Sequence, residues 1–203
     1  MTPPDGLRGR LEPLPRSQLE ADAPRVAPGL LGCVLRVGDR VGRIVEVEAY
    51  GGADDPASHA HRGRTGRNAT MFGRAGLLYC YRSYGIHTCA NVVTGAECEG
   101  QAVLLRAVEL LGSDEDLAPV RADRPAARRR VDLANGPGKL CEALGITLDD
   151  DGTDLCGPGS RATLCYDGAA PRHRVARGPR VGISVATGRP WRFWVEGSPY
   201  VSR

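Results

Sequence analysis

The sequence predicts a single compact domain of the α+β class, and three observations support this prediction. The chain has 203 residues, which is enough to bury one core but short for two. Segments with strand-like patterns, at residues 34–37, 42–50, 77–93 and 101–110, are interspersed with short helical segments. No internal repeat and no clear linker divides the chain, and its 41% hydrophobic and 25% charged residues are typical of globular proteins.

The N-terminal part of the chain is rich in proline and glycine. Residues 1–12 predict a flexible tail, so the folded domain would cover residues 13–203. Residues 16–35 favour short helical turns, which Pro24 and Pro28 would break.

The most informative segment is Val-Glu-Val-Glu-Ala-Tyr at residues 45–50. Because strand side chains alternate between faces, Glu46, Glu48 and Tyr50 would share one face, while the intervening valines and alanine point into a core. His59 follows nine residues after Tyr50. This grouping can hold a flat ring and place a general base beside it. The simpler alternative is a half-buried strand with solvated glutamates.

Residues 51–76 form a long connection of mostly polar and small side chains. A structureless loop of this length is uncommon inside a compact domain and is usually functional. We expect the part near Met71 to anchor back on the core.

Residues 77–93, Leu-Leu-Tyr-Cys-Tyr-Arg-Ser-Tyr-Gly-Ile-His-Thr-Cys-Ala-Asn-Val-Val, predict a β-hairpin with Tyr84 at or near its tip. Tyr79 and Tyr81 would share one face, and for Tyr79 we favour an ordinary role in the core. A tyrosine exposed at a hairpin tip would suit a wedge into a partner. Asn91, in an apolar strand, should hydrogen-bond inside a pocket or reduce stability.

The rest of the chain predicts the following elements in order: a central strand at 101–110 interrupted by Arg106, a helix within 109–130 that ends in three arginines, a helix at 135–145 stopped by Gly145, an exposed turn at 149–152, and strands at 181–185 and 191–195.

Positive charge is concentrated in one window of the chain. Residues 56–96 contain no Asp or Glu but five arginines, so this window carries +5, whereas the whole chain carries +3. Such a patch on a nearly neutral protein indicates a polyanionic partner. A GC-rich genome would explain why Lys139 is the only lysine, but not the absence of acids from the window.

Cysteine and histidine spacing argues against disulfides and metal. The seven cysteines are odd in number and lack C-x-x-C spacing. His59 and His61 lack a companion ligand at suitable spacing, so we expect neither a metal nor another cofactor.

No apolar run approaches the roughly 20 residues that span a bilayer, and the N-terminus lacks the apolar centre of a secretory signal. We therefore expect a cytoplasmic protein, nucleoid-associated in a prokaryote, with no membrane partner.

The order of several motifs resembles a known family. The segments RIVEVEAYGG, DPASHAHRGRTGRN, MFGRAGLLYCYRSYGIHTCANVV, VLLRAVE, NGPGKL and PWRFWVEGSPYVSR, from about residue 14 to the end, are similar to the alkyladenine (3-methyladenine) DNA glycosylases. The resemblance implies a mixed, mostly antiparallel curved sheet with flanking helices and a protruding hairpin. It also implies a monomeric repair enzyme that flips a damaged purine out of duplex DNA and hydrolyses its N-glycosidic bond. The expected lesions are 3-methyladenine and 7-methylguanine, with hypoxanthine and ethenoadenine left open.

The resemblance assigns the chemistry to three residues. Glu48 matches the catalytic glutamate that activates the attacking water, Arg106 matches the arginine that helps hold the water and a nearby phosphate, and His59 completes the catalytic set. A buried Glu48 can act as a base only if a positive group lies near it, and Arg106 is the candidate. Arg106 could equally do no more than neutralise Glu48, and the two roles are compatible.

The resemblance also assigns the binding of the flipped base. Tyr50, His59 and Tyr81 match the rings that sandwich it, and Asn91 matches the pocket asparagine that rejects the amino group of guanine. Tyr84 matches the tyrosine that fills the vacated stack. Flipping requires a few kcal/mol, and stacking on aromatic rings contributes about 1–3 kcal/mol per base.

Cationic side chains around the pocket would contact DNA phosphates without reading bases: Arg62, Arg64, Arg67, Arg82 and Lys139. Glycosylases that also cut the backbone usually use an amine. Because Lys139, at a predicted helix start, is better suited to a phosphate clamp, we expect a monofunctional enzyme.

Two departures from the family pattern concern the hairpin and the loop. Arg82 stands where apolar residues are more usual, and Ile86 stands where methionine is. Gly66 replaces a more usual proline and loosens its loop. These changes bear on substrate preference and DNA affinity.

Two other functions compete with a repair hydrolase. A DNA-damage-binding protein could keep the wedge and the basic patch without chemistry, although it needs no placed carboxylate. A nucleoside or nucleotide hydrolase could use the same pocket, but would have no use for Tyr84 at a hairpin tip.

Overall fold

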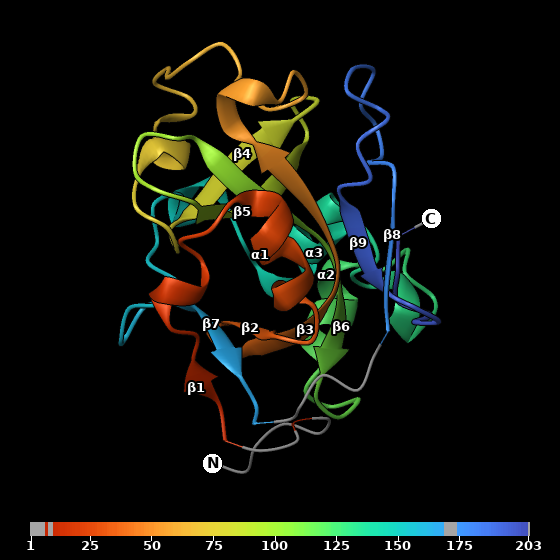
Figure 1. Cartoon of the computed structure of the whole chain (residues 1–203). Coiled ribbons are helices and arrows are strands. Elements are labelled where there is room, and N and C mark those ends of the chain that lie inside the picture. The colour runs from red at the N-terminus through yellow and green to blue at the C-terminus, as the bar shows by residue number, and fades with distance from the viewer. Residues whose placement is uncertain (1–6, 8–9, 169–173, 203) are drawn as a thin grey trace.

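The computed structural model describes residue 7 and residues 10–168 and 174–202. The remaining residues of the expected N-terminal tail, 1–6, 8 and 9, lie outside the described residues. The strands, seen in Figure 1, are β1 (Glu12–Pro13), β2 (Val34–Val37), β3 (Arg40–Gly51), β4 (Leu78–Ser83), β5 (His87–Thr94), β6 (Gln101–Leu111), β7 (Ala162–Tyr166), β8 (Val175–Gly178) and β9 (Arg192–Val195). The α-helices are α1 (Ala23–Leu30), α2 (Ala118–Asp123) and α3 (Pro137–Leu144).

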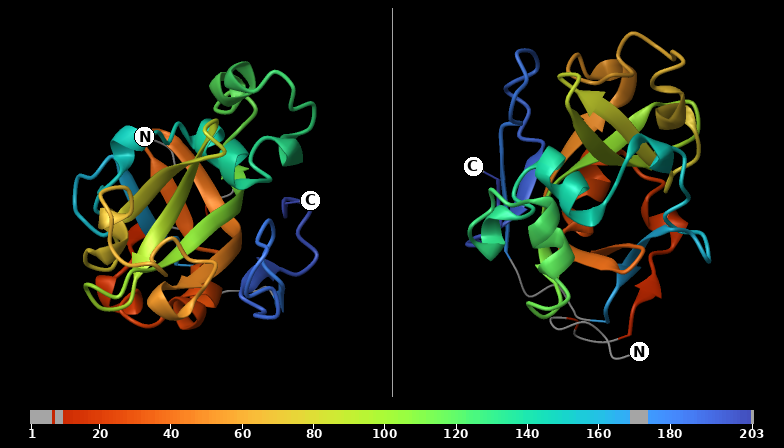
Figure 2. Two further views of the ribbon diagram at one scale, coloured as in Figure 1. Left: turned by 90° about the horizontal axis from the view of Figure 1, so that it is seen from above. Right: turned by 180° about the vertical axis from the view of Figure 1, so that it is seen from behind.

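The strands form one sheet in the order β1-β7-β2-β3-β6-β5-β4, with β8 and β9 attached beside β3. Every pairing between described residues is antiparallel. Figure 2 shows the long strands crossing the molecule and the C-terminal pair β8 and β9 at one side. This arrangement confirms the predicted α+β class, the mostly antiparallel sheet and the protruding hairpin.

Strand β3 changes its partner along its length. Its first residues pair with β2, whereas Glu46, Val47 and Glu48 pair with β9, and β6 lies along the other edge throughout. The pairing with β6 shifts register between Ile44 and Val47. Such a bulge bends a strand and redirects its side chains. The bend brings the C-terminal strand against the two glutamates.

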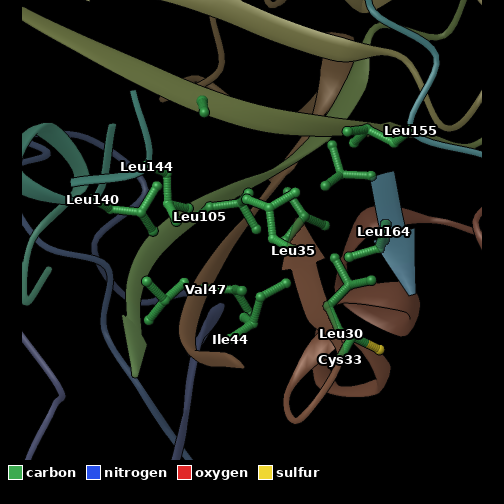
Figure 3. Packing of buried hydrophobic residues seen from close by; sticks show 14 of the residues in the cluster. Leu30, Cys33, Leu35, Ile44, Val47, Leu105, Leu140, Leu144, Leu155 and Leu164 are labelled. Carbon is green, nitrogen blue, oxygen red and sulfur yellow. The ribbon is translucent and has the colours of Figure 1, made fainter. Parts of the chain in front are cut away.

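One large hydrophobic cluster lies between the sheet and helices α1 and α3. Figure 3 shows Leu140 and Leu144 of α3 facing Leu105 of β6 and Val47 of β3. Val47 and Ala49 belong to this cluster, as alternation predicts. Ile44 takes the place expected for Val45, which is buried outside the cluster, because the register shift intervenes.

The two helices that flank the core depend on proline and glycine. Pro24 lies in the first turn of α1, where a missing N–H leaves no bond unmade, so it starts the helix instead of breaking it. Pro28 lies within the last turn. Helix α3 agrees with the prediction: Pro137 opens it, and Gly145, at φ 70°, ends it in the left-handed region.

Two predictions for later segments were wrong, and a third was confirmed only in part. The helix expected within 109–130 is only α2, because β6 runs to Leu111 and Pro125 follows the helix end. Residues 181–185 form no strand; β8 occupies Val175–Gly178 instead. The turn at 149–152 is not wholly exposed, since Asp150 is buried, accepts from Thr147 N at 2.8 Å and pairs with Arg161.

No helix in the described part of the chain is long and apolar enough to cross a membrane.

Candidate active site

A cavity of about 430 Å³ opens where the end of β3, the hairpin β4–β5 and residues 181–183 meet. Its wall is largely aromatic: Tyr50, His59, Tyr79, Tyr81 and Tyr84 line it. Three polar side chains complete the wall: Asn91 of β5, Arg106 of β6 and Arg67 of the connection at 51–76. Its size and composition are typical of small-molecule sites.

Glu48 lies directly beneath this cavity and touches three of the groups that line it. Its carboxylate accepts a hydrogen bond from Tyr50 Oη at 3.0 Å and from Val181 N at 2.7 Å. Arg106 Nη1 is 3.2 Å from Glu48 Oε1. The side chain is fully buried, so the alternative of a solvated glutamate on a half-buried strand is wrong.

Arg106 lines the cavity and comes from β6, the neighbour of β3. It pairs with Glu46 as well as Glu48, since its Nε donates to Glu46 Oε1 at 2.9 Å. Although desolvation opposes it, the charges of Glu48 and Glu46 raise the pKa of Arg106, so the group stays cationic. Two carboxylates on one strand therefore share one guanidinium.

Tyr50 is held from behind by a buried ion pair. The Arg180 guanidinium lies 4.6 Å from the centroid of the Tyr50 ring, and its Nη2 donates to Asp55 Oδ1 at 2.8 Å. Both charged side chains are fully buried. Desolvation, followed by the neighbouring Glu48 charge and hydrogen bond, raises the pKa of Tyr50, so its hydroxyl remains a donor to Glu48.

His59, Tyr79 and Tyr81 form a cluster of rings on another wall. His59 lies edge-on to Tyr81, with centroids 4.5 Å apart, and its Nδ1 is 3.1 Å from Tyr79 Oη. Tyr79 and Tyr81 stack at 5.6 Å. Desolvation and the charge of Arg67 lower the pKa of His59, which favours the neutral imidazole in this cavity.

Asn91 lies on β5 and is buried, as its predicted pocket role requires. Its amide nitrogen donates to the Tyr79 carbonyl at 3.1 Å. Tyr79 itself is only 1% exposed, in agreement with a core residue, yet it also lines the cavity.

The mouth of the cavity is exposed and basic. Tyr84 at the hairpin tip is 87% exposed and has a positive φ of 50°, and Ile86 is 72% exposed. Arg67 and Arg82 line the cavity, and Arg67 Nη2 donates to the Arg82 carbonyl at 2.9 Å.

The connection at 51–76 is closed on itself by Asn68, and Met71 joins it to a buried cluster that includes Tyr79 and Val93. Asn68 is buried and donates to the carbonyls of His59 and Gly63 at 2.9 and 3.1 Å. Arg62 and Arg64 are exposed on this connection and do not line the cavity.

Lys139 lies in the first turn of α3, exposed, and its Nζ donates to Asn135 Oδ1 at 2.8 Å. Pro137 of the same turn lines the cavity. The predicted base-binding residues are thus brought together, whereas of the predicted phosphate contacts only Arg67 and Arg82 line the cavity.

The two histidines considered as metal ligands have other partners. His59 Nδ1 lies 3.1 Å from Tyr79 Oη, and His61 Nδ1 lies 2.6 Å from the Ala53 carbonyl oxygen. No group of three His, Cys, Asp or Glu side chains that could hold a metal occurs among the described residues.

Sequence reasoning did not find the contributions of Val181, Arg180, Asp55 and Glu46. Val181 was placed in a strand that does not form. Arg180 and Asp55 lie 125 residues apart, so no local pattern connects them. For Glu46, strand alternation alone was a signal, because it placed Glu46 on the same face as Glu48.

Comparison with known proteins is consistent with this site. A family model described as methylpurine-DNA glycosylase (MPG) matches residues 17–199. A protein of Nocardia farcinica named "Putative 3-methyladenine DNA glycosylase" is 52% identical over 190 residues, covering 91% of this chain and 88% of that protein. Proteins with the same name from Burkholderia lata and Mycobacterium tuberculosis are 50% and 47% identical, covering 93% and 91% of this chain and 90% and 91% of theirs.

Proposed function

Because the chain belongs to the methylpurine-DNA glycosylase family and is therefore a DNA glycosylase, we propose that it removes alkylated purines from duplex DNA with a water activated by Glu48. The observation that carries the proposal is a fully buried carboxylate directly beneath a ring-lined cavity. A protein that only binds DNA has no use for such a group.

The proposed step is a hydrolysis at the anomeric carbon. Water attacks C1′ of the flipped nucleotide while Glu48 accepts its proton, and the bond from C1′ to the purine nitrogen breaks with its electron pair moving to the base. A cationic alkylpurine leaves as a neutral molecule, so it needs no general acid. Arg106 Nη1, 3.2 Å from Glu48 Oε1, would help to orient this carboxylate toward the attacking water.

The lesion would bind between Tyr50 on one side and His59 with Tyr81 on the other. Alkylation at N3 or N7 makes a purine cationic, and π-faces attract cations. A neutral His59, favoured by its lowered pKa, adds no repulsive charge. Asn91 would face the base and discriminate against the amino group of normal guanine. The aromatic rings favour the cationic bases 3-methyladenine and 7-methylguanine over normal purines.

Extraction of the base would use the exposed hairpin tip. Tyr84 would enter the stack from which the lesion leaves, supported by Ile86. Arg62, Arg64, Arg67, Arg82 and Lys139 would contact phosphates. All these groups come from one chain, so the protein would act as a monomer.

The enzyme would leave the DNA backbone intact. A backbone-cleaving glycosylase forms a covalent imine through an amine. Lys139 is the only side-chain amine, and its bond to Asn135 on the exposed first turn of α3 suits a phosphate contact instead.

The test is incubation with duplexes that each carry one 3-methyladenine, 7-methylguanine, hypoxanthine or ethenoadenine, followed by alkali cleavage. We expect strand breaks at alkylated purines only after alkali, and no covalent adduct on borohydride reduction. Tight lesion binding without base release would instead identify a non-catalytic damage-binding protein.

A further inference from the structure

The proposed reaction leaves a second buried carboxylate without a role. Glu46 lies two residues before Glu48 on β3, is fully buried and does not line the cavity. Its Oε1 accepts from Arg106 Nε at 2.9 Å and Arg192 Nε at 2.7 Å. Ser202 supplies two more donors: its Oγ to Oε1 at 2.8 Å and its backbone N to Oε2 at 2.6 Å. A buried group with four donors is built into the site.

The contacts of Glu46 fix the orientation of Arg106. A guanidinium is planar, so two fixed nitrogens determine where the third points. Nε is bonded to Glu46, and Nη2 donates to Ser202 Oγ at 3.1 Å. Nη1 is then directed at Glu48 Oε1. Ser202 Oγ both donates to Glu46 and accepts from Arg106, so it joins the two groups.

The balance of buried charge around Glu46 and Glu48 also indicates that Glu46 helps to position Arg106. Two buried carboxylates beside one arginine would leave excess negative charge, and unpaired buried charge is costly. Arg192, paired to Glu46, supplies the second cation, which leaves Arg106 available to Glu48. Arg192 Nη2 also reaches the Ser202 carbonyl at 3.4 Å.

We propose that Ser202 and Glu46 are positioning residues for base excision: they hold the guanidinium of Arg106 so that Nη1 faces Glu48, and neither touches the substrate. This proposal rests on the proposed function, because it assumes that Glu48 performs the chemistry. It gives the segment after β9 a part in the reaction in addition to its packing.

The experiment compares Ser202→Ala with wild type in single-turnover excision from a duplex that carries one 7-methylguanine. Loss of the two hydrogen bonds that the hydroxyl makes to Glu46 and Arg106 should lower the rate by about tenfold or more. Binding of the lesion duplex and the melting temperature should change little. Ser202→Thr, which keeps the hydroxyl, should restore most of the rate.

Ser198→Ala is the matched control. Ser198 lies in the same segment. Among the described contacts its Oγ accepts only from Tyr200 N, at 3.3 Å, and it makes no bond to Glu46 or Glu48. This variant should excise at the wild-type rate.

A further readout separates positioning from a merely structural role. If Ser202 acts through Arg106, Ser202→Ala should lower the rate little further in an Arg106→Lys variant, because that variant lacks the guanidinium that Ser202 orients. Glu46→Gln, which places an amide among four donors, should show the same pattern with a larger loss.

A Ser202→Ala variant that excises at the wild-type rate would overturn the proposal. So would a loss that persists undiminished in the Arg106→Lys background or follows the melting temperature alone. If wild type releases no base while binding lesions, the proposed function itself fails, and that result is distinct from both.

Discussion

The floor and the rim of the cavity are built on opposite principles. We define the floor as Glu46, Glu48 and Arg106 with the Asp55–Arg180 pair behind Tyr50, all buried and all paired. We define the rim as Tyr84, Arg67 and Arg82, which line the mouth of the cavity, together with the nearby exposed Ile86 and the exposed Arg62 and Arg64 of the connection at 51–76.

This difference separates two tasks. Buried pairs hold fixed geometry because an unpaired charge there is costly, so the floor suits a single chemical step. Exposed cations and rings are free to meet a partner, so the rim suits DNA. Substitutions in the floor should therefore alter rate or stability, and substitutions in the rim should alter binding.

The largest effect should follow from Glu48→Gln. Loss of a general base typically lowers a rate by about 10²–10⁴-fold. The amide keeps the size of the side chain, so lesion binding should persist. Single-turnover excision and a binding titration on the same duplex measure both quantities. Parallel loss of binding and rate would remove the distinction between floor and rim.

Asp55→Asn should test the floor through stability. Removing one partner of a buried ion pair typically costs about 3–5 kcal/mol, here by leaving Arg180 unpaired. Chemical denaturation measures the loss in free energy of unfolding. Arg25→Ala, at an exposed position of α1, is a control that should change stability little.

Asp55→Asn should also change how the free energy of unfolding depends on pH. Despite desolvation, hydrogen bonds from Arg180 and from the backbone of Gly51 lower the pKa of Asp55 below its ordinary value of 3.8. The unfolded chain therefore takes up the proton first as pH falls. The stabilisation is present above 3.8 and is lost as pH falls through the lowered value. Asp55→Asn should flatten that part of the stability profile.

Tyr84→Ala should have a moderate effect confined to the rim. Loss of one stacking ring corresponds to about 1–3 kcal/mol of binding free energy. The affinity of the variant for a duplex with a paired lesion should fall clearly. Its excision rate on a lesion in a single-nucleotide bulge should fall less, because extraction of a bulged base leaves little stacking for Tyr84 to replace. Equal affinity of the variant and wild type for every duplex would contradict a wedge.

The smallest effect should come from Arg62→Ala or Arg64→Ala. Each removes one proposed phosphate contact, so the slope of log affinity against log salt should fall by about one. Single-turnover rates at saturating enzyme should not change. Titrations at several salt concentrations measure the slope, and Arg25→Ala should leave it unaltered.

The sequence predicted what local patterns encode. Alternation placed Glu46, Glu48 and Tyr50 on one face, and turn residues predicted the hairpin with Tyr84 at its tip. The fold class followed from the same patterns.

Features that depend on contacts between distant parts of the chain were missed or predicted wrongly. The bulge in β3 placed Ile44 in the large hydrophobic cluster, whereas Val45 is buried outside it. Arg180 meets Asp55 across 125 residues, and Ser202 meets Glu46 across 156, so only the folded chain brings them together. Val181, expected in a strand, instead donates its amide to Glu48.

The change of partner along β3 also has a consequence for biosynthesis. Glu46 pairs with Trp194 of β9, and its last donors come from Ser202, so the surroundings of Glu46 stay incomplete until nearly all of this sequence has left the ribosome. The hairpin and its neighbour β6 pair over short sequence separations and can form much earlier. A nascent chain would thus form the hairpin that carries Tyr84 before the donors that hold Glu46 are in place.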